Sequence, residues 1–329
     1  MYSRAMPREF PACSGCGLCR LVCPMWRDHR DPRFSPEGLA KALQSGATAL
    51  ELAAPLAACS LCGACDPVCP EGIDLSGMIM DLRSRLPRRA ELAALQAKLA
   101  QAAASAKAPA AGALLLPGAD LRANPSLLAR ARTLLGLRSA DDDGADIALA
   151  LETGGDIDPA RRRQLLGRLD GRSLVVGDGL LLAALRRWLP AARLHSLGEA
   201  LSNLVAIRRR LASADFYVIE ARAYHADYER LVVHYDRLRA DTGCALNLDL
   251  QRIAIPALTR SLTRKSAPLG DEDVTQVRWM LKGLAPRRIV VESLADRAAF
   301  ERACDIPVLH LAELAEDSMM KKETPHACG

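Results

Sequence analysis

The sequence predicts an α+β multidomain protein, in which an α-helical, cysteine-rich domain is followed by two related α/β lobes. Eight of the eleven cysteines lie in two short runs near the N-terminus, residues 13–23 and 59–69. After the second run, short apolar segments alternate with longer amphipathic ones, which is typical of a parallel α/β fold. In that part, a segment that begins at Ser173 resembles one that begins at Arg288, which indicates two related lobes.

Length, composition and charge restrict the class of protein. A chain of 329 residues, half of them apolar, is long enough for two or three domains with their own cores. The formal net charge of +5 is spread along the chain, which argues against a nucleic-acid-binding protein. No apolar run reaches the roughly 18 residues of a membrane-spanning helix, and the first residues lack a signal-peptide core. We expect a cytoplasmic protein without a transmembrane segment, which reaches a membrane only through a partner.

Both cysteine runs follow the pattern C-x2-C-x2-C-x3-C-P, as CSGCGLCRLVCP and CSLCGACDPVCP. Thiolate is a soft ligand that suits iron, zinc and cuprous copper. Zinc sites usually combine two pairs of ligands across a longer loop. Three closely spaced cysteines and a fourth before proline are instead the spacing of bacterial two-cluster ferredoxins. The sequence therefore predicts two [4Fe-4S] clusters as cofactors, with zinc as the less favoured alternative.

The same spacing predicts which cysteines bind which cluster. The first three cysteines of a run bind one cluster, and the fourth reaches across to the other. The cofactor-binding and metal-ligating residues thus form two crossed sets. Cluster one is assigned to Cys13, Cys16, Cys19 and Cys69, and cluster two to Cys59, Cys62, Cys65 and Cys23. Gly15, Gly17 and Gly63 are expected to let the backbone curl so that its N–H groups point at sulfur.

Helical patterns fill the rest of the N-terminal region. Ser35-Pro36-Glu37 reads as a helix start, and IDLSGMIMDLRSRL is an amphipathic segment closed by Pro87. We therefore expect a helical two-cluster domain over residues 1–87. The following segment is rich in alanine and places its leucines in one helical stripe, so residues 88–111 are predicted to form a helical linker.

The two lobes are expected at residues 112–205 and 206–317, followed by a flexible tail at 318–329. In the first lobe ALLLPG, DIALALE and SLVVGDG are predicted as strands, and NPSLLARARTLLGL, PARRRQLLGRL and LLLAALRRWL as helices. The repeat gives residues 175–194 and 290–309 the same spacing. His195 and His310 fall at matching places after short apolar stretches, so a structural role or a helix cap is favoured over metal ligation or acid–base chemistry.

The quoted motifs resemble a known family. CSLCGACDPVCPEGID resembles the electron-transfer domain of heterodisulfide reductase small subunits. It is also similar to the iron-sulfur subunits of anaerobic glycerol-3-phosphate dehydrogenase, glycolate oxidase and lactate-utilisation complexes. ALLLPGA, RAYHADYERL and IPVLHLAEL resemble parts of the CCG domain of the same proteins. The resemblance implies a two-cluster ferredoxin-type domain followed by a CCG-type domain.

The chain departs from this family where the CCG domain has cysteines. In the family these hold an unusual iron-sulfur centre or shape the site of disulfide chemistry. The matching places here hold Ala119, Glu152, Thr153 and Tyr228. Because a cluster needs thiolate ligands, we expect a degenerate CCG domain with no cofactor and no catalytic residues. The remaining cysteines do not match those places: Cys244 and Cys304 are expected to be small apolar residues, and Cys328 to lie in the tail.

The favoured function is that of an electron-transfer subunit in an oxidoreductase complex. It would relay single electrons through the two clusters, with the degenerate lobes as a docking surface. The expected partners are a flavoprotein or another redox subunit, together with a membrane cytochrome or quinone-linked subunit. The alternative is an enzyme subunit that reduces a disulfide or a quinone at the C-terminal lobes. A third hypothesis, a cluster-containing sensor, finds no basic recognition element in the sequence.

Overall fold

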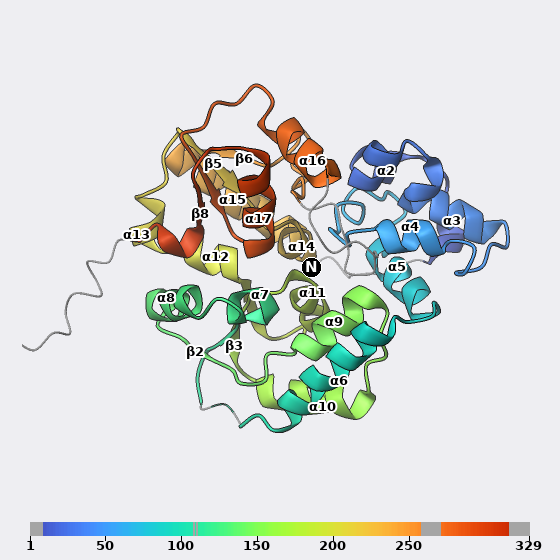
Figure 1. Ribbon diagram of the computed structural model, residues 1–329, viewed down its shortest axis with the longest axis horizontal. Coiled ribbons are helices and arrows are strands. Elements are labelled where there is room, and N and C mark those ends of the chain that lie inside the picture. Colours follow the sequence, from blue (N-terminus) through green and yellow to red (C-terminus); the bar gives the residue numbers. More distant parts are fainter. Residues whose placement is uncertain (1–8, 108, 110, 258–270, 316–329) are drawn as a thin grey trace, which may run out of the picture.

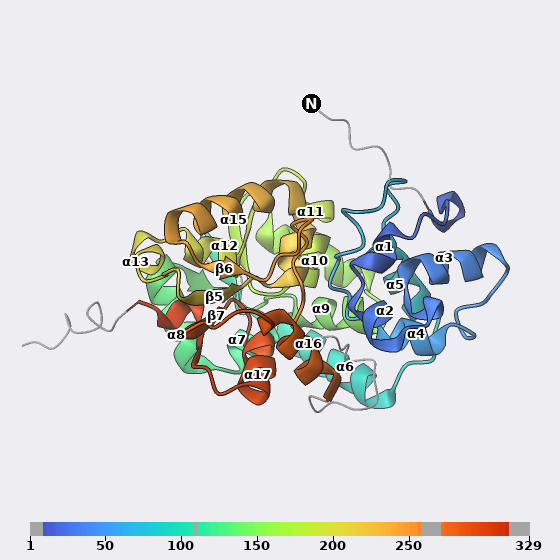
Figure 2. The same cartoon turned by 90° about the horizontal axis from the view of Figure 1, so that it is seen from above.

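A computed structural model describes residues 9–107, 109, 111–257 and 271–315. Its cysteine-rich segment is helical, and two four-stranded parallel sheets with flanking helices follow along the chain. We call each sheet with its helices a lobe. Figures 1 and 2 both show the cysteine-rich segment, in blue, on one side of the molecule. The first lobe is drawn mainly in green and the second in yellow to red. The predicted mixture of helices and parallel sheets is confirmed.

The cysteine-rich segment is built from short helices. They are η1 (Phe10–Ala12), α1 (Leu18–Leu21), α2 (Pro24–His29), η2 (Pro32–Phe34), α3 (Pro36–Gln44), α4 (Ala53–Ala58) and α5 (Leu75–Ser84). Ser35 caps α3, because its Oγ accepts a hydrogen bond from the N–H of Gly38 at 3.0 Å. The helix start predicted at this serine is therefore confirmed. Helix α6 (Ala90–Ala104) then leads to the lobes.

The first lobe has four parallel strands in the order β2-β1-β3-β4. The strands are β1 (Leu114–Leu116), β2 (Arg138–Ser139), β3 (Ser173–Val176) and β4 (Arg193–Ser196). The helices are α7 (Gly118–Arg122), α8 (Pro125–Leu135), α9 (Ala145–Thr153), α10 (Pro159–Leu169), α11 (Gly179–Trp188), α12 (Leu197–Ser202) and α13 (Val205–Arg208). The strands and helices predicted here are present, with one exception.

The strand predicted for DIALALE is wrong, because residues 146–152 lie within helix α9. Residues 146–150 are all buried, so no polar face marks the helical period. A short apolar run that is buried all round looks the same for a helix and for a strand. Alanine and leucine, which dominate this run, favour the helix. The edge strand of this sheet is instead β2, whose arginine and serine give no apolar signal.

The second lobe repeats the first. Its parallel strands follow the order β6-β5-β7-β8, which matches β2-β1-β3-β4 position by position. The elements are β5 (Asp215–Val218), α14 (Ala221–Ala226), α15 (Tyr228–Thr242), β6 (Ala245–Leu246), α16 (Asp271–Leu281), β7 (Arg288–Val291), α17 (Leu294–Ala303), β8 (Val308–His310) and η3 (Leu311–Glu313). The sequence repeat thus corresponds to β3-α11-β4 in one lobe and β7-α17-β8 in the other. The boundaries at 87, 111, 205 and 317 stay predictions, and the tail with Cys328 lies outside the described residues.

One hydrophobic core joins the cysteine-rich segment to both lobes. Val22, Cys62 and Ala64 share it with residues of the first lobe, such as Leu115, and of the second, such as Tyr217. Helices α11 and α14 contact each other where the lobes meet. A Cβ added to Gly179 at the start of α11 would lie only 2.5 Å from Cβ of a residue in α14. The cysteine runs are therefore packed against the lobes.

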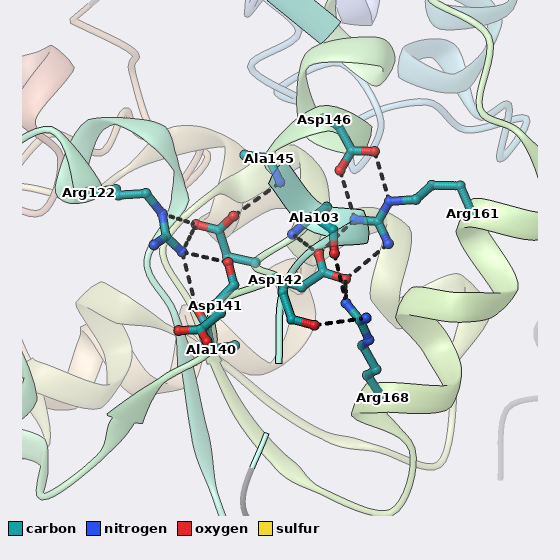
Figure 3. Close-up of polar contacts among 12 residues, drawn as sticks. Ala103, Arg122, Ala140, Asp141, Asp142, Ala145, Asp146, Arg161 and Arg168 are labelled. Atoms are coloured by element: carbon teal, nitrogen blue, oxygen red, sulfur yellow. Dashed lines mark hydrogen bonds and ion pairs between the residues drawn. The ribbon is translucent and has the colours of Figure 1, made fainter. Parts of the chain in front are cut away.

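A buried ion-pair cluster fastens α6 to the first lobe (Figure 3). Asp142, only 4% exposed, accepts hydrogen bonds from Arg161 at 2.6 and 3.0 Å and from Arg168 at 2.8 Å. Arg161 also pairs with Asp146 in α9 at 2.9 Å. Arg168 donates in addition to the main-chain oxygen of Ala103, near the end of α6, at 3.0 Å. The carboxylate thereby connects the linker helix, α9 and α10.

Candidate iron-sulfur sites

Four of the predicted ligands line one pocket at the surface of the molecule. Cys13, Cys16, Cys19 and Cys69 surround it, and we call this set the outer site. Cys16 is exposed and Cys19 is buried, with the other two in between. The fourth member comes from the second run, so the fold brings it to the first three cysteines of the first run. The four thiols line a pocket and do not converge on one point. Within the described residues, no group of three His, Cys, Asp or Glu side chains is arranged to hold a single metal ion.

The other four predicted ligands lie deeper, and we call them the inner site. They are Cys23, Cys59, Cys62 and Cys65. Electrostatic interactions join them: Cys65 is influenced by the other three, and Cys23 by Cys59 and Cys62. All except Cys59 are buried. The structure therefore brings together the two crossed sets of four that the spacing predicts, while their role as ligands stays a prediction.

Burial makes the thiolates of the inner site unfavourable without a cation. It is the main cause that raises the pKa of Cys62 to about 11 and the pKa of Cys65 well above its usual value. Neighbouring thiolates raise both further. A coordinated metal reverses this effect, because it deprotonates a coordinating thiol outright. The donor set therefore suits a metal cluster.

The backbone of both runs turns through the left-handed region. Gly15, Gly17 and Gly63 have φ angles of 78°, 76° and 76°, as expected for residues that let the chain curl. Gly17 and Gly63 occupy equivalent positions in the two runs and share the same φ. Leu61, with a φ of 54°, adopts this conformation too, which its side chain gave no reason to predict.

Two buried hydrogen-bond donors at the inner site support the fit of a cluster there. The hydroxyl of Ser60 is buried and has no partner among the described groups except the Cys62 thiol that it faces. Nε of Arg27 is also buried and has no hydrogen-bond partner among the described residues. The Arg27 guanidinium interacts electrostatically with Cys23 and Cys62. Donors left without oxygen or nitrogen acceptors are suited to face the sulfur atoms of a cluster.

Two arginines clamp the second cysteine run to the lobes. Arg83, 2% exposed, donates to the main-chain oxygens of Leu56 at 2.7 Å and Glu152 at 2.6 Å, and also to that of Cys59. Arg222 in α14 donates to the main-chain oxygen of Ser60 at 2.8 Å and to the Glu152 carboxylate at 2.9 Å. Sequence reasoning missed both arginines. For Arg83 a signal existed, since it follows Leu75 and Ile79 at helical spacing on the apolar face of α5.

Four positions of this chain correspond to cysteines in the family that it resembles, and three of the four side chains there make hydrogen bonds. The Glu152 carboxylate accepts a hydrogen bond from Arg222, and the Thr153 hydroxyl donates to the main-chain oxygen of Leu149 at 2.6 Å. The Tyr228 hydroxyl donates to the main-chain oxygen of Gln251 at 3.1 Å, and Ala119 lies exposed in α7. These side chains carry no thiolate.

The other candidate residues have structural roles. His310 caps η3, since its Nδ1 accepts the N–H of Ala312 at 3.1 Å, as expected for a capping residue. His195 pairs with Glu199 at 2.9 Å. Cys244 is buried in the core that joins the lobes. Cys304 packs against the core of the second lobe, with its thiol 3.4 Å from the Phe300 oxygen.

Comparison with known proteins supports the chemistry of the N-terminal region. The model of the 4Fe-4S dicluster domain family matches residues 9–73, which contain all eight cysteines of the two runs. The match supports a ferredoxin-type domain that binds [4Fe-4S] clusters and transfers electrons. No curated protein and no solved structure matches the chain, so the likeness to heterodisulfide reductase and its relatives stays a prediction. None of the helices in the described ranges is long and apolar enough to cross a membrane.

Proposed function

We propose that the protein is the electron-transfer subunit of an oxidoreductase complex and relays single electrons through two [4Fe-4S] clusters. The observation that carries this proposal is the grouping of eight cysteines into an outer and an inner site. Each group takes three cysteines from one run and one from the other. This crossed arrangement is the one that two-cluster ferredoxins use.

In this proposal the outer site consists of Cys13, Cys16, Cys19 and Cys69, and the inner site of Cys59, Cys62, Cys65 and Cys23. Each set would supply four thiolates to one cluster, which contributes one-electron redox chemistry when bound. The exposed Cys16 makes the outer site the one that a redox partner can approach from solvent. The inner site borders the lobes through Arg83, Arg222 and the shared core.

We assign the lobes a docking role instead of a catalytic one. The polar and aromatic side chains at the places of the missing cysteines support this role, since they offer no soft ligands. The alternative, reduction of a disulfide or a quinone at the lobes, gains no support from the two thiols described there. Cys244 and Cys304 lie in different cores. The partners remain as expected from the sequence: a flavoprotein or other redox subunit, with membrane attachment through a cytochrome or quinone-linked subunit.

Anaerobic affinity purification of the tagged full-length chain from its own cells tests this proposal. We expect a flavoprotein or a cytochrome to copurify, and its reduced cofactor to bleach the iron-sulfur absorbance of the chain within the complex. A Cys16→Ser variant serves as the matched control, because it should weaken this electron transfer while leaving the lobes intact. Turnover of a disulfide or a quinone by the isolated chain, supplied only with a chemical reductant, would contradict the non-catalytic role.

A further inference from the structure

The two sites differ in the charges that surround them. Two carboxylates, Glu37 and Glu71, line the outer pocket. Two basic groups lie at the same site: Arg20 pairs with Glu37 at 3.5 Å, and Lys41 donates to the main-chain oxygen of Cys13 at 2.9 Å. The charges at the outer site therefore nearly cancel, and solvent reaches the site at the exposed Cys16.

Guanidinium groups predominate among the charges that act on the inner thiols, and two of them donate to main-chain oxygens of the second cysteine run. Arg27 interacts electrostatically with Cys23 and Cys62, Arg83 with Cys59, and Arg222 with Cys62. One carboxylate, that of Asp66, acts on these thiols directly, since it follows Cys65. The other carboxylates act on the arginines: Glu152, Asp178 and Glu220 on Arg222, and Asp249 on Arg27. Of the charged side chains described as acting on the inner thiols themselves, three are thus guanidinium groups and one is a carboxylate.

Two physical effects compete at the inner site. A cluster held by four thiolates carries a net negative charge that grows on reduction, so burial by itself disfavours the reduced form. Nearby cations stabilise the reduced form, and they act more strongly in a buried site, because its effective dielectric constant is low. Hydrogen bonds to the cluster sulfurs act in the same direction as the cations. The Ser60 hydroxyl and Arg27 Nε are buried donors that would be free to make such bonds.

We infer that Arg27, Arg83 and Arg222 hold the reduction potential of the inner cluster above that of the outer cluster, so that electrons move from the outer site to the inner one. This inference rests on the proposed two-cluster relay. With both sites loaded, one electron would pass from the outer to the inner site, so that the outer cluster would be oxidised as the inner one is reduced, and no other reactant would be consumed. A one-electron donor on the partner subunit would then reduce the outer cluster again. The arginines thereby act as positioning and tuning residues.

The test is an anaerobic redox titration of the full-length holoprotein, followed by electron paramagnetic resonance. Cys19→Ser and Cys23→Ser variants assign the two signals to the outer and inner sites. We expect the inner cluster to be reduced first as the potential is lowered. Arg222→Gln should shift the inner midpoint to lower potential and leave the outer midpoint in place. Arg222→Lys should restore most of the shift, because it keeps the charge.

Matched variants separate charge from structure. Arg208→Gln removes an arginine that pairs with Asp241 away from both sites and should change neither midpoint. If Arg222→Gln loses iron, Arg27→Gln gives the same test. Arg27 stacks on Trp279 at 4.3 Å and has no hydrogen bond to the second cysteine run among the described contacts.

The outcomes distinguish the inference from the relay on which it rests. A wild-type protein with a single titrating cluster would overturn the relay itself. Two clusters of which the inner has the lower midpoint would overturn the inference and leave the relay standing. An inner midpoint that stays unchanged in both the Arg222→Gln and Arg27→Gln variants would also overturn the inference, since the cations would then have no effect on the potential.

Discussion

Nδ1 of His225, in helix α14 of the second lobe, lies 2.7 Å from the main-chain oxygen of Cys62 in the inner site. Nε2 of the same ring accepts the N–H of Ala254 at 3.2 Å, so the ring proton is on Nδ1 and His225 donates to Cys62. Burial lowers the pKa of His225 to about 4, which keeps the ring neutral. This hydrogen bond joins residues 163 positions apart and ties the inner site to a lobe.

The close contact of His225 with the second cysteine run predicts a difference between two glycine variants. A Cβ at Gly63 would lie 2.9 Å from Cβ of His225, whereas at the equivalent Gly17 it would meet the guanidinium end of Arg20 at 3.3 Å. Both glycines have a φ of 76°, so the backbone cost of alanine is shared. We expect Gly63→Ala to destabilise the fold by about 1–3 kcal/mol more than Gly17→Ala and to lose inner-site iron. Thermal unfolding and iron analysis measure this, and equal losses in both variants would show that the His225 contact is unimportant.

The crossed ligand sets predict opposite effects of two cysteines in the same run. Cys19→Ser should damage the outer cluster and Cys23→Ser the inner cluster, although only three residues separate the two. Electron paramagnetic resonance of the dithionite-reduced variants measures which signal is lost. An intact inner cluster in Cys23→Ser would mean that the sets are not crossed.

The buried carboxylate of Asp142 predicts a large effect on stability. Asp142→Ala leaves Arg161 and Arg168 without their shared partner in an environment where their side chains are only 10% and 18% exposed. We expect a loss of about 3–5 kcal/mol in the free energy of unfolding, as when one member of a buried ion pair is removed. Urea denaturation followed by circular dichroism measures it. Asp141→Ala at the exposed neighbouring position should cost far less, and a similar cost for both variants would refute the explanation.

A buried carboxyl in the second lobe predicts that stability falls as pH rises. Glu292 accepts hydrogen bonds from the Tyr217 and Tyr235 hydroxyls, each at 2.6 Å. Burial is the main cause that raises its pKa from 4.5 to about 7, and the two tyrosines oppose this effect. Because the folded state holds the proton more tightly than the unfolded state, stability should decline between about pH 4.5 and 7.

The variant Glu292→Gln cannot ionise and should therefore remove this part of the pH dependence, which amounts to about 3 kcal/mol. Thermal unfolding at pH 4.5 and pH 7.5 measures the difference, and the gap between the two unfolding temperatures should narrow in the variant. Asp296, whose pKa burial raises to about 8, should keep some pH dependence in place. Glu229→Gln, at an exposed position of α15, is the control and should behave like the wild type. An unchanged gap in Glu292→Gln would show that this carboxyl does not titrate in that range.

The positions of the two lobe cysteines predict that their removal leaves the iron content unchanged. The double variant Cys244→Ala/Cys304→Ala should keep the iron content and the visible spectrum of the wild type, because neither cysteine belongs to the outer or inner site. Iron analysis and the visible absorbance spectrum are the measurements. Loss of iron from the otherwise folded double variant would reveal a metal centre in the lobes.

Local signals explain what could be predicted from the sequence. The cysteine spacing indicated which thiols come together, and Ser35 marked the start of α3. The two similar apolar segments predicted strands β3 and β7, because a buried parallel strand appears in the sequence as a short apolar run. DIALALE misled for the same reason, since a fully buried helix also reads as an apolar run.

Contacts between distant segments explain what could not be predicted. Arg222 reaches Ser60 and His225 reaches Cys62 only because α14 packs beside the second cysteine run. Nothing near either residue in the sequence indicates that partner. Arg83 was detectable as a basic residue on an apolar helix face, but its acceptors are main-chain oxygens, which leave no mark in a sequence.

The number of iron and sulfide atoms per chain tests the two-cluster relay most directly. The anaerobically purified full-length protein should contain about eight irons and about eight acid-labile sulfides, because two complete sets of four thiolates are present. A value near four irons per chain, or zinc bound in stoichiometric amount, would contradict the account.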